Sequence, residues 1–174
     1  MLTDDGNTTF LIAFAGSEPV GHLNLRWLGT NEAEVRAYVT ETPELSQISV
    51  WPPEMQSQGI GTRMITAAEA MITDRGHGQV GLGVEVTNER ARRLYERLGY
   101  LDWGHGVYRD RWAEVDEDGN EVAHEDPCVY LLKRFIGLGQ CTGEPLTTLA
   151  VRLIPGSPAG SRGSLSRYRL ESLG

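Results

Sequence analysis

Between residues 44 and 103, the spacing of apolar side chains switches back and forth between the period of a β-strand and that of an α-helix. Strand, helix, strand, helix and strand are predicted in turn over residues 44–51, 61–75, 80–86, 88–98 and 100–103. A strand joined to the next strand through a helix pairs with it in parallel, and the helices cover the sheet. This region therefore predicts an α/β fold, with a central sheet flanked by helices.

Residues that start and stop elements stand at the boundaries of these segments. Pro52 and Pro53 end the first strand because neither has an N–H group to donate. Gly76 stops the first helix, Asn88 is suited to cap the second, and Gly99 ends it. Local chemistry and hydrophobic period therefore indicate the same boundaries.

Antiparallel strands are predicted on both sides of this region. Residues 9–15 and 20–27 indicate a hairpin joined by the turn Gly16-Ser17-Glu18-Pro19. A late strand and the two arms of a polar turn are predicted over residues 127–135, 111–115 and 121–124. Together with the parallel pairing in the middle, these hairpins predict a mixed, twisted sheet.

The composition changes after residue 136. Residues 1–136 contain the predicted elements and are long enough for one core, so we expect them to form a single domain. Residues 137–174 are rich in Gly, Ser, Pro and Arg, contain almost no acidic residues, and predict a disordered tail. Within the tail only residues 146–154 have the pattern of a regular element. An incidental extension is favoured over an interaction arm.

The chain has a formal charge of −8, which is not evenly spread. Four arginines and two glutamates follow residue 136, so residues 1–136 carry −10. Such a surface repels nucleic-acid phosphates, and no nucleic-acid partner is expected. It mildly favours cationic partners, although a charged surface kept for solubility is the simpler explanation.

No segment predicts export or membrane insertion. The longest apolar run, 10–15, is too short to cross a bilayer, and the acidic start of the chain is unlike a secretory signal. The two cysteines, Cys128 and Cys141, do not define a disulfide framework. We therefore expect a cytoplasmic protein with no membrane partner.

No metal site is expected either. The four histidines have no ligand spacing with one another or with the cysteines, and they stand at positions 22, 77, 105 and 124. Asp116-x-Asp118-x-Asn120 begins like a calcium loop, but Glu121 stands where that loop requires glycine. This stretch predicts a turn.

The turn between the strand at 44–51 and the following helix carries glycines at positions 59 and 61. There the backbone can approach a ligand closely, and N–H groups point the same way at a helix start, an arrangement that binds a pyrophosphate. Gly-x-Gly before a helix is a weak signal alone, because a tight turn explains it as well. Met64 stands where a dinucleotide fingerprint has its third glycine, and Gly81-Leu82-Gly83 inside a strand fails the same test.

Two motifs resemble those of a known superfamily. Val50-x-Pro52 followed by Gln56-x-x-Gly59-x-Gly61 is similar to the acyl-CoA loop of the GNAT superfamily of N-acetyltransferases, Gln/Arg-x-x-Gly-x-Gly/Ala. Residues 88–100 resemble its second motif, Asn-x-x-Ala-x-x-Leu-Tyr-x-x-x-Gly-Phe/Tyr. The resemblance covers residues 9–135. It implies a GNAT (acyl-CoA N-acyltransferase) fold and an N-acetyltransferase that moves the acetyl group of acetyl-CoA to an amine by direct attack in a ternary complex.

The resemblance also implies roles for individual residues. Backbone groups at Ile48 and Val50 would pair with the pantetheine arm, which fits beside a splayed strand like an added strand, and an N–H near Val50 would face the thioester oxygen. Seven consecutive residues would hold the pyrophosphate: Gln56, Ser57, Gln58, Gly59, Ile60, Gly61 and Thr62. Asn88 would contact the cofactor arm, and the Tyr95 hydroxyl would protonate the departing thiolate. Without the motif, core packing explains Tyr95 and helix capping explains Asn88 equally well.

Two departures from the superfamily pattern bear on these expectations. The loop has Gln-Ser-Gln where many relatives have basic residues, and Arg63 is the only cation expected nearby. The first predicted strand, at residue 9, resembles the superfamily's second strand, so the opening strand and two helices that wall the acceptor pocket are missing. The domain is thus expected to be N-terminally shortened, with the acceptor site less well defined than the cofactor site.

Transfer to an amine requires a base that removes its proton. Glu85 is the first candidate, because it lies on the strand face opposite Val84 and Val86, and Glu44 and His22 are further candidates. A surface salt bridge explains each of them more simply. A covalent acyl-cysteine route is disfavoured, since Cys128 has no evident histidine partner.

The acceptor is expected to be a small-molecule amine or a protein amine, and the acidic domain favours a cationic small molecule. The oligomeric state stays open, a homodimer included. The alternative function is a catalytically inactive module that binds acyl-CoA as a regulator or partner. The missing front elements and the weakly basic loop favour this alternative, and Tyr95 speaks against it.

Overall fold

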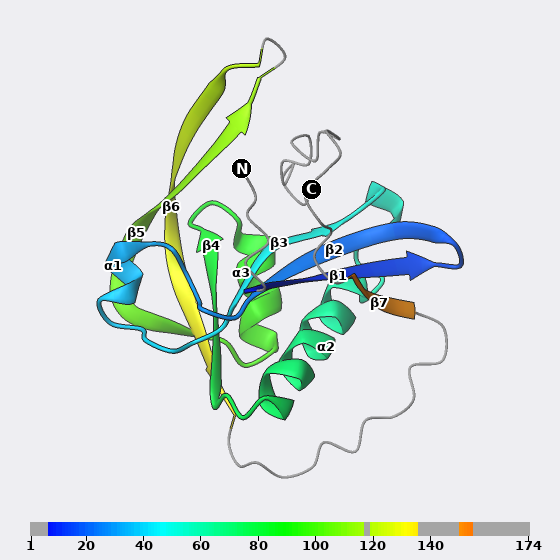
Figure 1. Cartoon of the computed structure of the whole chain (residues 1–174), viewed down its shortest axis with the longest axis horizontal. Helices are drawn as coiled ribbons and strands as arrows, with labels where there is room; N and C mark the ends of the chain where they lie inside the picture. The colour runs from blue at the N-terminus through cyan, green and yellow to red at the C-terminus, as the bar shows by residue number, and fades with distance from the viewer. Residues whose placement is uncertain (1–6, 117–118, 136–149, 155–174) are drawn as a thin grey trace.

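The computed structural model describes residues 7–116, 119–135 and 150–154. In this part of the chain, seven strands form one mixed sheet in the order β5-β6-β4-β3-β2-β1-β7 (Figure 1). The strands are β1 Thr8–Ala15, β2 Glu18–Arg26, β3 Glu44–Val50, β4 Gln79–Glu85, β5 Leu101–Val115, β6 Glu121–Arg134 and β7 Ala150–Ile154. The helices are α1 Ala33–Arg36, the short 3-10 helix η1 Pro53–Met55, α2 Ile60–Asp74 and α3 Glu89–Arg97.

The predicted α/β organisation is confirmed. The elements β3, α2, β4, α3 and β5 follow one another as the period changes indicate, and β3 pairs with β4 in parallel. The other strand pairs are antiparallel, which makes the sheet mixed. The last two predicted strands were too short, because β5 and β6 run on as one long ribbon to the polar turn.

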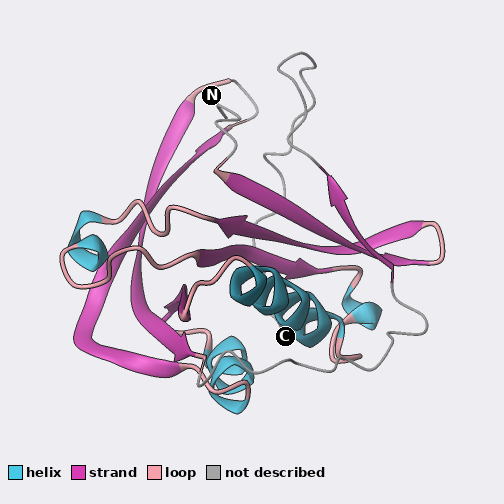
Figure 2. Cartoon of the chain, turned by 60° about the horizontal axis from the view of Figure 1, so that its bottom comes forward, coloured by secondary structure: helices cyan, strands magenta, loops and turns pink. Residues whose placement is uncertain are grey.

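One face of the sheet is covered by α2 and α3 (Figure 2). The buried side chains of these helices are Ile60, Met64, Ile65, Ala68 and Ile72 from α2, and Ala91 and Tyr95 from α3. They pack against inward-facing strand residues such as Leu23, Leu45 and Leu82. Fully burying one large apolar side chain contributes about 1.5–3 kcal/mol, so this face holds most of the fold together.

The opposite face has a smaller core, which was not predicted. Val35 of α1 packs there against Tyr108, Cys128 and Tyr130. Successive residues of a strand point to opposite faces, so Val129 and Leu131 of β6 face α2 and α3, whereas Cys128 and Tyr130 face α1. The connection between β2 and β3, which includes α1, thereby covers part of the face that lacks α2 and α3.

Part of the segment predicted as a tail belongs to the sheet. β7 pairs antiparallel with β1, from Phe10↔Ile154 to Phe14↔Ala150. It falls within residues 146–154, the one stretch of the tail with the pattern of an element, and the rest of residues 137–174 lies outside the described residues. β7 thus borders β1, the strand that resembles the superfamily's second. None of the helices in the described ranges is long and apolar enough to span a membrane.

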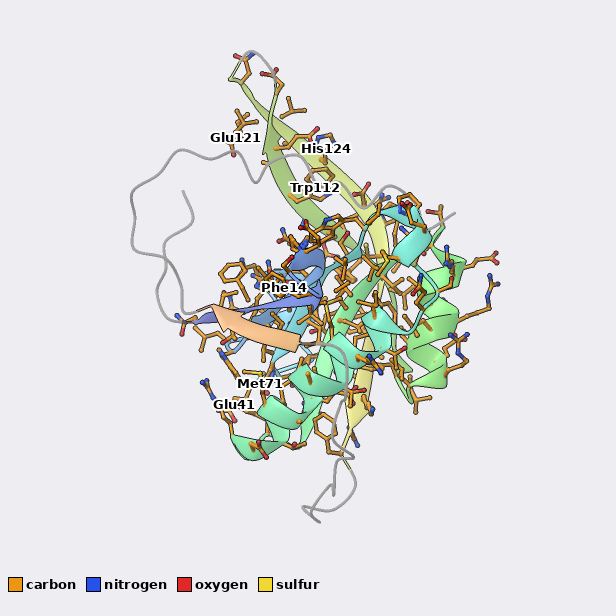
Figure 3. The ribbon with its side chains drawn as sticks, turned by 90° about the vertical axis from the view of Figure 1, so that its right-hand side faces the viewer. Phe14, Glu41, Met71, Trp112, Glu121 and His124 are labelled. Atoms are coloured by element: carbon orange, nitrogen blue, oxygen red, sulfur yellow. The ribbon has the colours of Figure 1, made fainter. Side chains whose placement is uncertain are left out.

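The β5–β6 ribbon projects beyond the rest of the sheet (Figure 1). Trp112 and His124, labelled in Figure 3, lie on this projection and stack with ring centroids 4.1 Å apart. The indole N–H of Trp112 donates to Asp126 at 2.7 Å, and His124 Nε2 lies 3.0 Å from Glu114. These cross-strand contacts stabilise the ribbon where it leaves the sheet.

Candidate active site

A gap opens between β3 and β4. Only Glu44↔Gly81 and Leu45↔Leu82 pair across these two strands. Beyond Leu45, β3 remains paired with β2 on its other side as far as Val50, with a register shift opposite Gln47, whose φ is 49°. The edge of β3 that faces β4 therefore presents backbone groups to the gap. Ile48 and Val50 both lie in this part of β3, and their side chains pack against the main core.

The loop after β3 leads directly into α2. Gly59 has φ 78°, a left-handed conformation that favours glycine, and it precedes the first residue of α2. Within the described part of the chain no side chain caps this helix, so its first N–H groups remain available to an anion. A Cβ placed on Gly61 would be in ordinary van der Waals contact with Leu94 and Val50, each at 4.0 Å, so Gly61 lies where α2, α3 and β3 approach one another.

The two glutamines of the loop stabilise its own conformation. Gln56 Nε2 donates to the Val50 carbonyl at 3.1 Å, and Gln58 Nε2 donates to the Glu54 carbonyl at 2.6 Å. Their side chains are thus engaged within the loop. An anion bound there would contact backbone N–H groups of these residues rather than their side chains.

The structure brings a second cation to the loop. The Arg90 guanidinium donates a hydrogen bond to the Ser57 hydroxyl, so the expectation that Arg63 is the only cation nearby is wrong. Arg90 lies in the first turn of α3, and α3 starts beside the loop because β3 and β4 are parallel neighbours whose helices begin at the same end of the sheet. The separation of 33 residues between Ser57 and Arg90 hid this contact from the sequence. The parallel pairing was the one signal that could have indicated it.

Asn88 and Tyr95 lie on α3, as the second motif predicted. Asn88 Oδ1 accepts a hydrogen bond from the Ala91 N–H at 3.0 Å, which makes Asn88 the N-cap of the helix. Tyr95 is 8% exposed, and its ring meets Tyr100 edge to face at 6.0 Å. Burial raises the pKa of Tyr95 to about 12. The hydroxyl therefore keeps its proton at neutral pH.

Glu44 is a buried carboxyl group at the end of the gap where β3 and β4 are paired. Its neighbour Leu45 faces α2, so Glu44 points to the other face of the sheet, which carries α1. It is 5% exposed, and the Arg26 guanidinium lies 3.0 Å from it. Burial raises the pKa of Glu44 to about 7, and the attraction of Arg26 and a hydrogen bond from Thr30 counteract this only in part. Glu44 thus exchanges its proton near neutral pH, a property suited to acid–base chemistry.

The other candidate bases have different surroundings. Glu85 is exposed at the end of β4 and accepts a hydrogen bond from the Thr87 hydroxyl. His22 is half-buried beside Trp51, with ring centroids 5.5 Å apart, and burial lowers its pKa. Cys128 is buried, and burial raises its pKa to about 12, so it is a thiol at neutral pH.

The chain is similar to known acetyltransferases. The sequence profile described as "Acetyltransferase (GNAT) family" matches residues 1–100. A mycothiol acetyltransferase of Rhodococcus erythropolis is 35% identical over 91 residues, which are 51% of this chain and 29% of that protein. The chain thus spans less than a third of the length of this relative.

Solved structures share the fold. A Bacillus subtilis acetyltransferase in complex with CoA superimposes with a TM-score of 0.54 and 18% identity, over 76% of this chain and 80% of that one. An aminoglycoside acetyltransferase in complex with coenzyme A and kanamycin gives a TM-score of 0.52 and 20% identity, over 74% and 67% of the two chains. The fold prediction is therefore confirmed.

The sequence profile covers more than half of the chain, and both motifs lie within its matched range. The gapped β3–β4 pair and the glycine-led start of α2 stand where the motifs indicate. On these grounds, the chain belongs to the acetyltransferase (GNAT) family.

Proposed function

We propose that this protein is an N-acetyltransferase that moves the acetyl group of acetyl-CoA to an amine. The observation that supports this best is the gap between β3 and β4, which leads to an uncapped helix start flanked by Arg90. A pantetheine arm suits the unpaired edge of β3, and a diphosphate suits the start of α2. Membership in the family supports the same assignment.

The proposed cofactor contacts follow the described geometry. Backbone groups of Ile48 and Val50 pair with the pantetheine amides. The pyrophosphate lies against backbone N–H groups of residues 56–62, with Arg90 supplying the positive charge that the loop itself lacks. Asn88 caps α3 through its carbonyl oxygen, and its amide N–H groups point to the cofactor arm in this proposal.

The proposed reaction is direct attack in a ternary complex. The amine nitrogen forms a bond to the acetyl carbon while the carbon–sulfur bond breaks, and a backbone N–H near Val50 stabilises the charge that grows on the thioester oxygen. The Tyr95 hydroxyl gives its proton to the departing thiolate. Its raised pKa keeps Tyr95 protonated until that step. Tyr95 then regains a proton from solvent, so the net products are an amide and free CoA.

We propose Glu44 as the base that takes the proton from the amine. Its burial and its pKa near 7 distinguish it from Glu85, which is exposed and hydrogen-bonded to Thr87. Because Glu44 is only 5% exposed, the proton reaches it through a water molecule. Glu85, the first candidate from the sequence, is the second candidate here, and replacing each with glutamine separates the two.

The acceptor in this proposal is a small-molecule amine. A thiol-release assay with acetyl-CoA and a panel of amines tests the function, with release that depends on the amine as the expected result. Calorimetric titration with CoA supplies the second readout. Binding of CoA without release on any amine would instead support the inactive acyl-CoA-binding module.

A further inference from the structure

A cavity of about 190 Å³ lies between the sheet and the connection that joins β2 to β3. Its lining comes almost entirely from that connection, residues 27–43, and β6 contributes Tyr130. The proposed acetyl transfer assigns a role to none of these lining residues. The cavity is therefore a feature of the fold that still lacks a function.

Tyr130 brings a buried hydroxyl group without a partner to this cavity. The residue is fully buried, and its hydroxyl has no hydrogen-bond partner among the described residues. Burial raises the pKa of Tyr130, so the phenol keeps its proton and remains a donor. Gly81 of β4 makes room for this hydroxyl, because a methyl group on Gly81 would overlap it. A phenylalanine would fill the same place without leaving a buried donor unpaired, so the hydroxyl points to a group that occupies the cavity.

Thr42, a second buried residue of the lining, has one hydrogen-bonding position left. Its hydroxyl donates to the Thr40 carbonyl at 2.9 Å and accepts from the side-chain amide of Gln79. A hydroxyl group has one proton to donate and two lone pairs, so one lone pair of Thr42 remains. A hydrogen-bond donor in the cavity can use it.

Thr30, also buried in the lining, is in the same condition. Its hydroxyl accepts from the Glu32 N–H at 3.2 Å and donates to the Glu44 carboxyl group. One lone pair of Thr30 is thus left for a further donor. The buried hydroxyls of the lining therefore offer the proton of Tyr130 together with acceptor oxygens of Thr30 and Thr42.

A ligand hydroxyl group suits this combination best, because it accepts one proton and donates another. A carboxylate only accepts, and it would lie near Glu44, the carboxyl group that acts electrostatically on Tyr130. An ammonium group only donates, which leaves the Tyr130 proton without an acceptor. Arg36 and Glu41 carry opposite charges in the lining, so together they favour neither an anion nor a cation.

The volume of the cavity limits the size of its ligand. A protein cavity of about 150 Å³ holds a six-carbon ring, so this one suits a molecule of about six to eight non-hydrogen atoms. Water is the simplest occupant, and at roughly 30 Å³ per molecule about six would fill the space. A polyol of three or four carbons presents the same hydroxyl groups in one molecule, and its binding releases several ordered waters.

The cavity lies away from the place proposed for the thioester. Thr42 precedes β3 and Val50 ends it, and the seven residues of β3 span about 20 Å at roughly 3.3 Å per residue. A molecule of about eight non-hydrogen atoms cannot bridge that length. A ligand in this cavity is thus not the acceptor of the acetyl group.

We infer that this cavity binds a small neutral polyol of three or four carbons, with one hydroxyl accepting from Tyr130 and others donating to Thr30 and Thr42. The bound polyol holds the β2–β3 connection against the sheet and stabilises the folded chain by mass action. The inference is independent of the proposed function, because it requires neither CoA nor an amine.

The test uses glycerol and erythritol as probes, titrated into the isotope-labelled full chain and followed by amide chemical shifts. Saturable shifts are expected in residues 28–30 and 39–42, and none in residues 56–62 of the loop before α2. Y130F should weaken the binding of both probes about fivefold, the loss of one neutral hydrogen bond. Y38F is the matched control, on an exposed tyrosine of the same connection, and should bind both probes as the unchanged protein does.

Two charged relatives of glycerol test the ligand class on the unchanged protein. Glycerate has a carboxylate in place of one terminal alcohol, and serinol has an ammonium group in place of the central hydroxyl. Each should bind at least about fivefold more weakly than glycerol, because a charged group loses hydration in the cavity and the lining supplies no net counter-charge. Thermal unfolding checks that Y130F and Y38F are folded.

The outcomes separate the polyol site from a cavity that holds water alone. A fivefold loss confined to Y130F, with shifts gathered at residues 28–30 and 39–42, supports the inference. The inference is overturned if neither polyol gives saturable shifts, which assigns the cavity to water. Equal affinities of Y130F and the unchanged protein overturn it too, as does a charged relative that binds as tightly as glycerol. None of these results depends on whether the protein binds CoA.

Discussion

Glu44 should make the stability of the folded protein depend on pH, and E44Q should remove that dependence. Its usual pKa is 4.5 and its pKa in the fold is about 7. Each tenfold change in proton affinity corresponds to roughly 1.4 kcal/mol, so the whole rise corresponds to about 3 kcal/mol. The group is nearly fully buried, so solvent screening does not reduce this figure much.

The direction follows from proton linkage. The folded state holds the Glu44 proton more tightly than the unfolded state does, so the unfolded state loses this proton first as the pH rises above 4.5. The contribution of Glu44 to the free energy of unfolding is therefore greatest below pH 4.5, falls as the pH rises to about 7, and is constant above that. Between pH 5 and pH 8 the loss is about 2–3 kcal/mol.

Urea unfolding at pH 5, 6, 7 and 8 measures this effect. The unchanged protein should lose about 2–3 kcal/mol more stability than E44Q across the series. E18Q, on an exposed glutamate at the start of β2, is the control and should follow the unchanged protein. Parallel curves for E44Q and the unchanged protein, within about 0.5 kcal/mol, would refute the reasoning that burial dominates over the Arg26 pair.

Three further predictions concern the cofactor side of the gap. R90Q should weaken CoA binding about tenfold by calorimetry, because one charge-assisted contact is lost. R97Q, at the far end of α3, should leave the affinity unchanged. Equal affinities of R90Q and the unchanged protein would show that Arg90 does not contact CoA. Y95F should lower kcat at least tenfold with CoA affinity unchanged, and an unaltered kcat would exclude Tyr95 as the acid. G59A should lower the free energy of unfolding, measured with urea, by about 1–2 kcal/mol, because the φ of Gly59 is 78°. G78A, at a glycine with an ordinary φ, should lower it less. Equal losses in the two variants would contradict the role of the Gly59 φ.

The sequence predicted the middle of the fold well because local signals and hydrophobic period agree there. The predicted strand at 80–86 is observed as Gln79–Glu85, and the helix at 61–75 as Ile60–Asp74. Side chains such as Leu82 and Met64, which define these periods, are buried in the main core. Where one face of a strand or helix is buried, the spacing of its apolar side chains must match the period of that element.

Features that depend on distant parts of the chain were missed. Arg90 meets Ser57 only because two helices start at the same end of the sheet, and no local pattern reports that. The four-residue α1 is too short to show a period, and Val35 alone anchors it. β7 stands in a segment whose composition predicts disorder, yet it pairs with β1, since an open strand edge offers backbone hydrogen bonds to any extended segment.

The elements that carry the candidate site were predicted from the sequence. The two motifs pointed to the loop before α2 and to Tyr95 on α3, and both helices pack on the same side of the sheet. Glu44 was one of three candidate bases, and only its burial, a property of the folded chain, sets it apart. The Tyr108 hydroxyl of β5 lies close to Gly83 of β4, with β6 between the two strands in the sheet. Hydrophobic periodicity does not predict such a contact.

Calorimetric titration of CoA into the folded protein tests the central claim most directly. The open edge of β3, the uncapped start of α2 and Arg90 together predict saturable binding of one CoA per chain, weakened about tenfold in R90Q. The titration is repeated at several temperatures, because a binding enthalpy that is zero at one temperature is not zero at the others. A folded protein that gives no heat with CoA or acetyl-CoA at any of them would contradict the account.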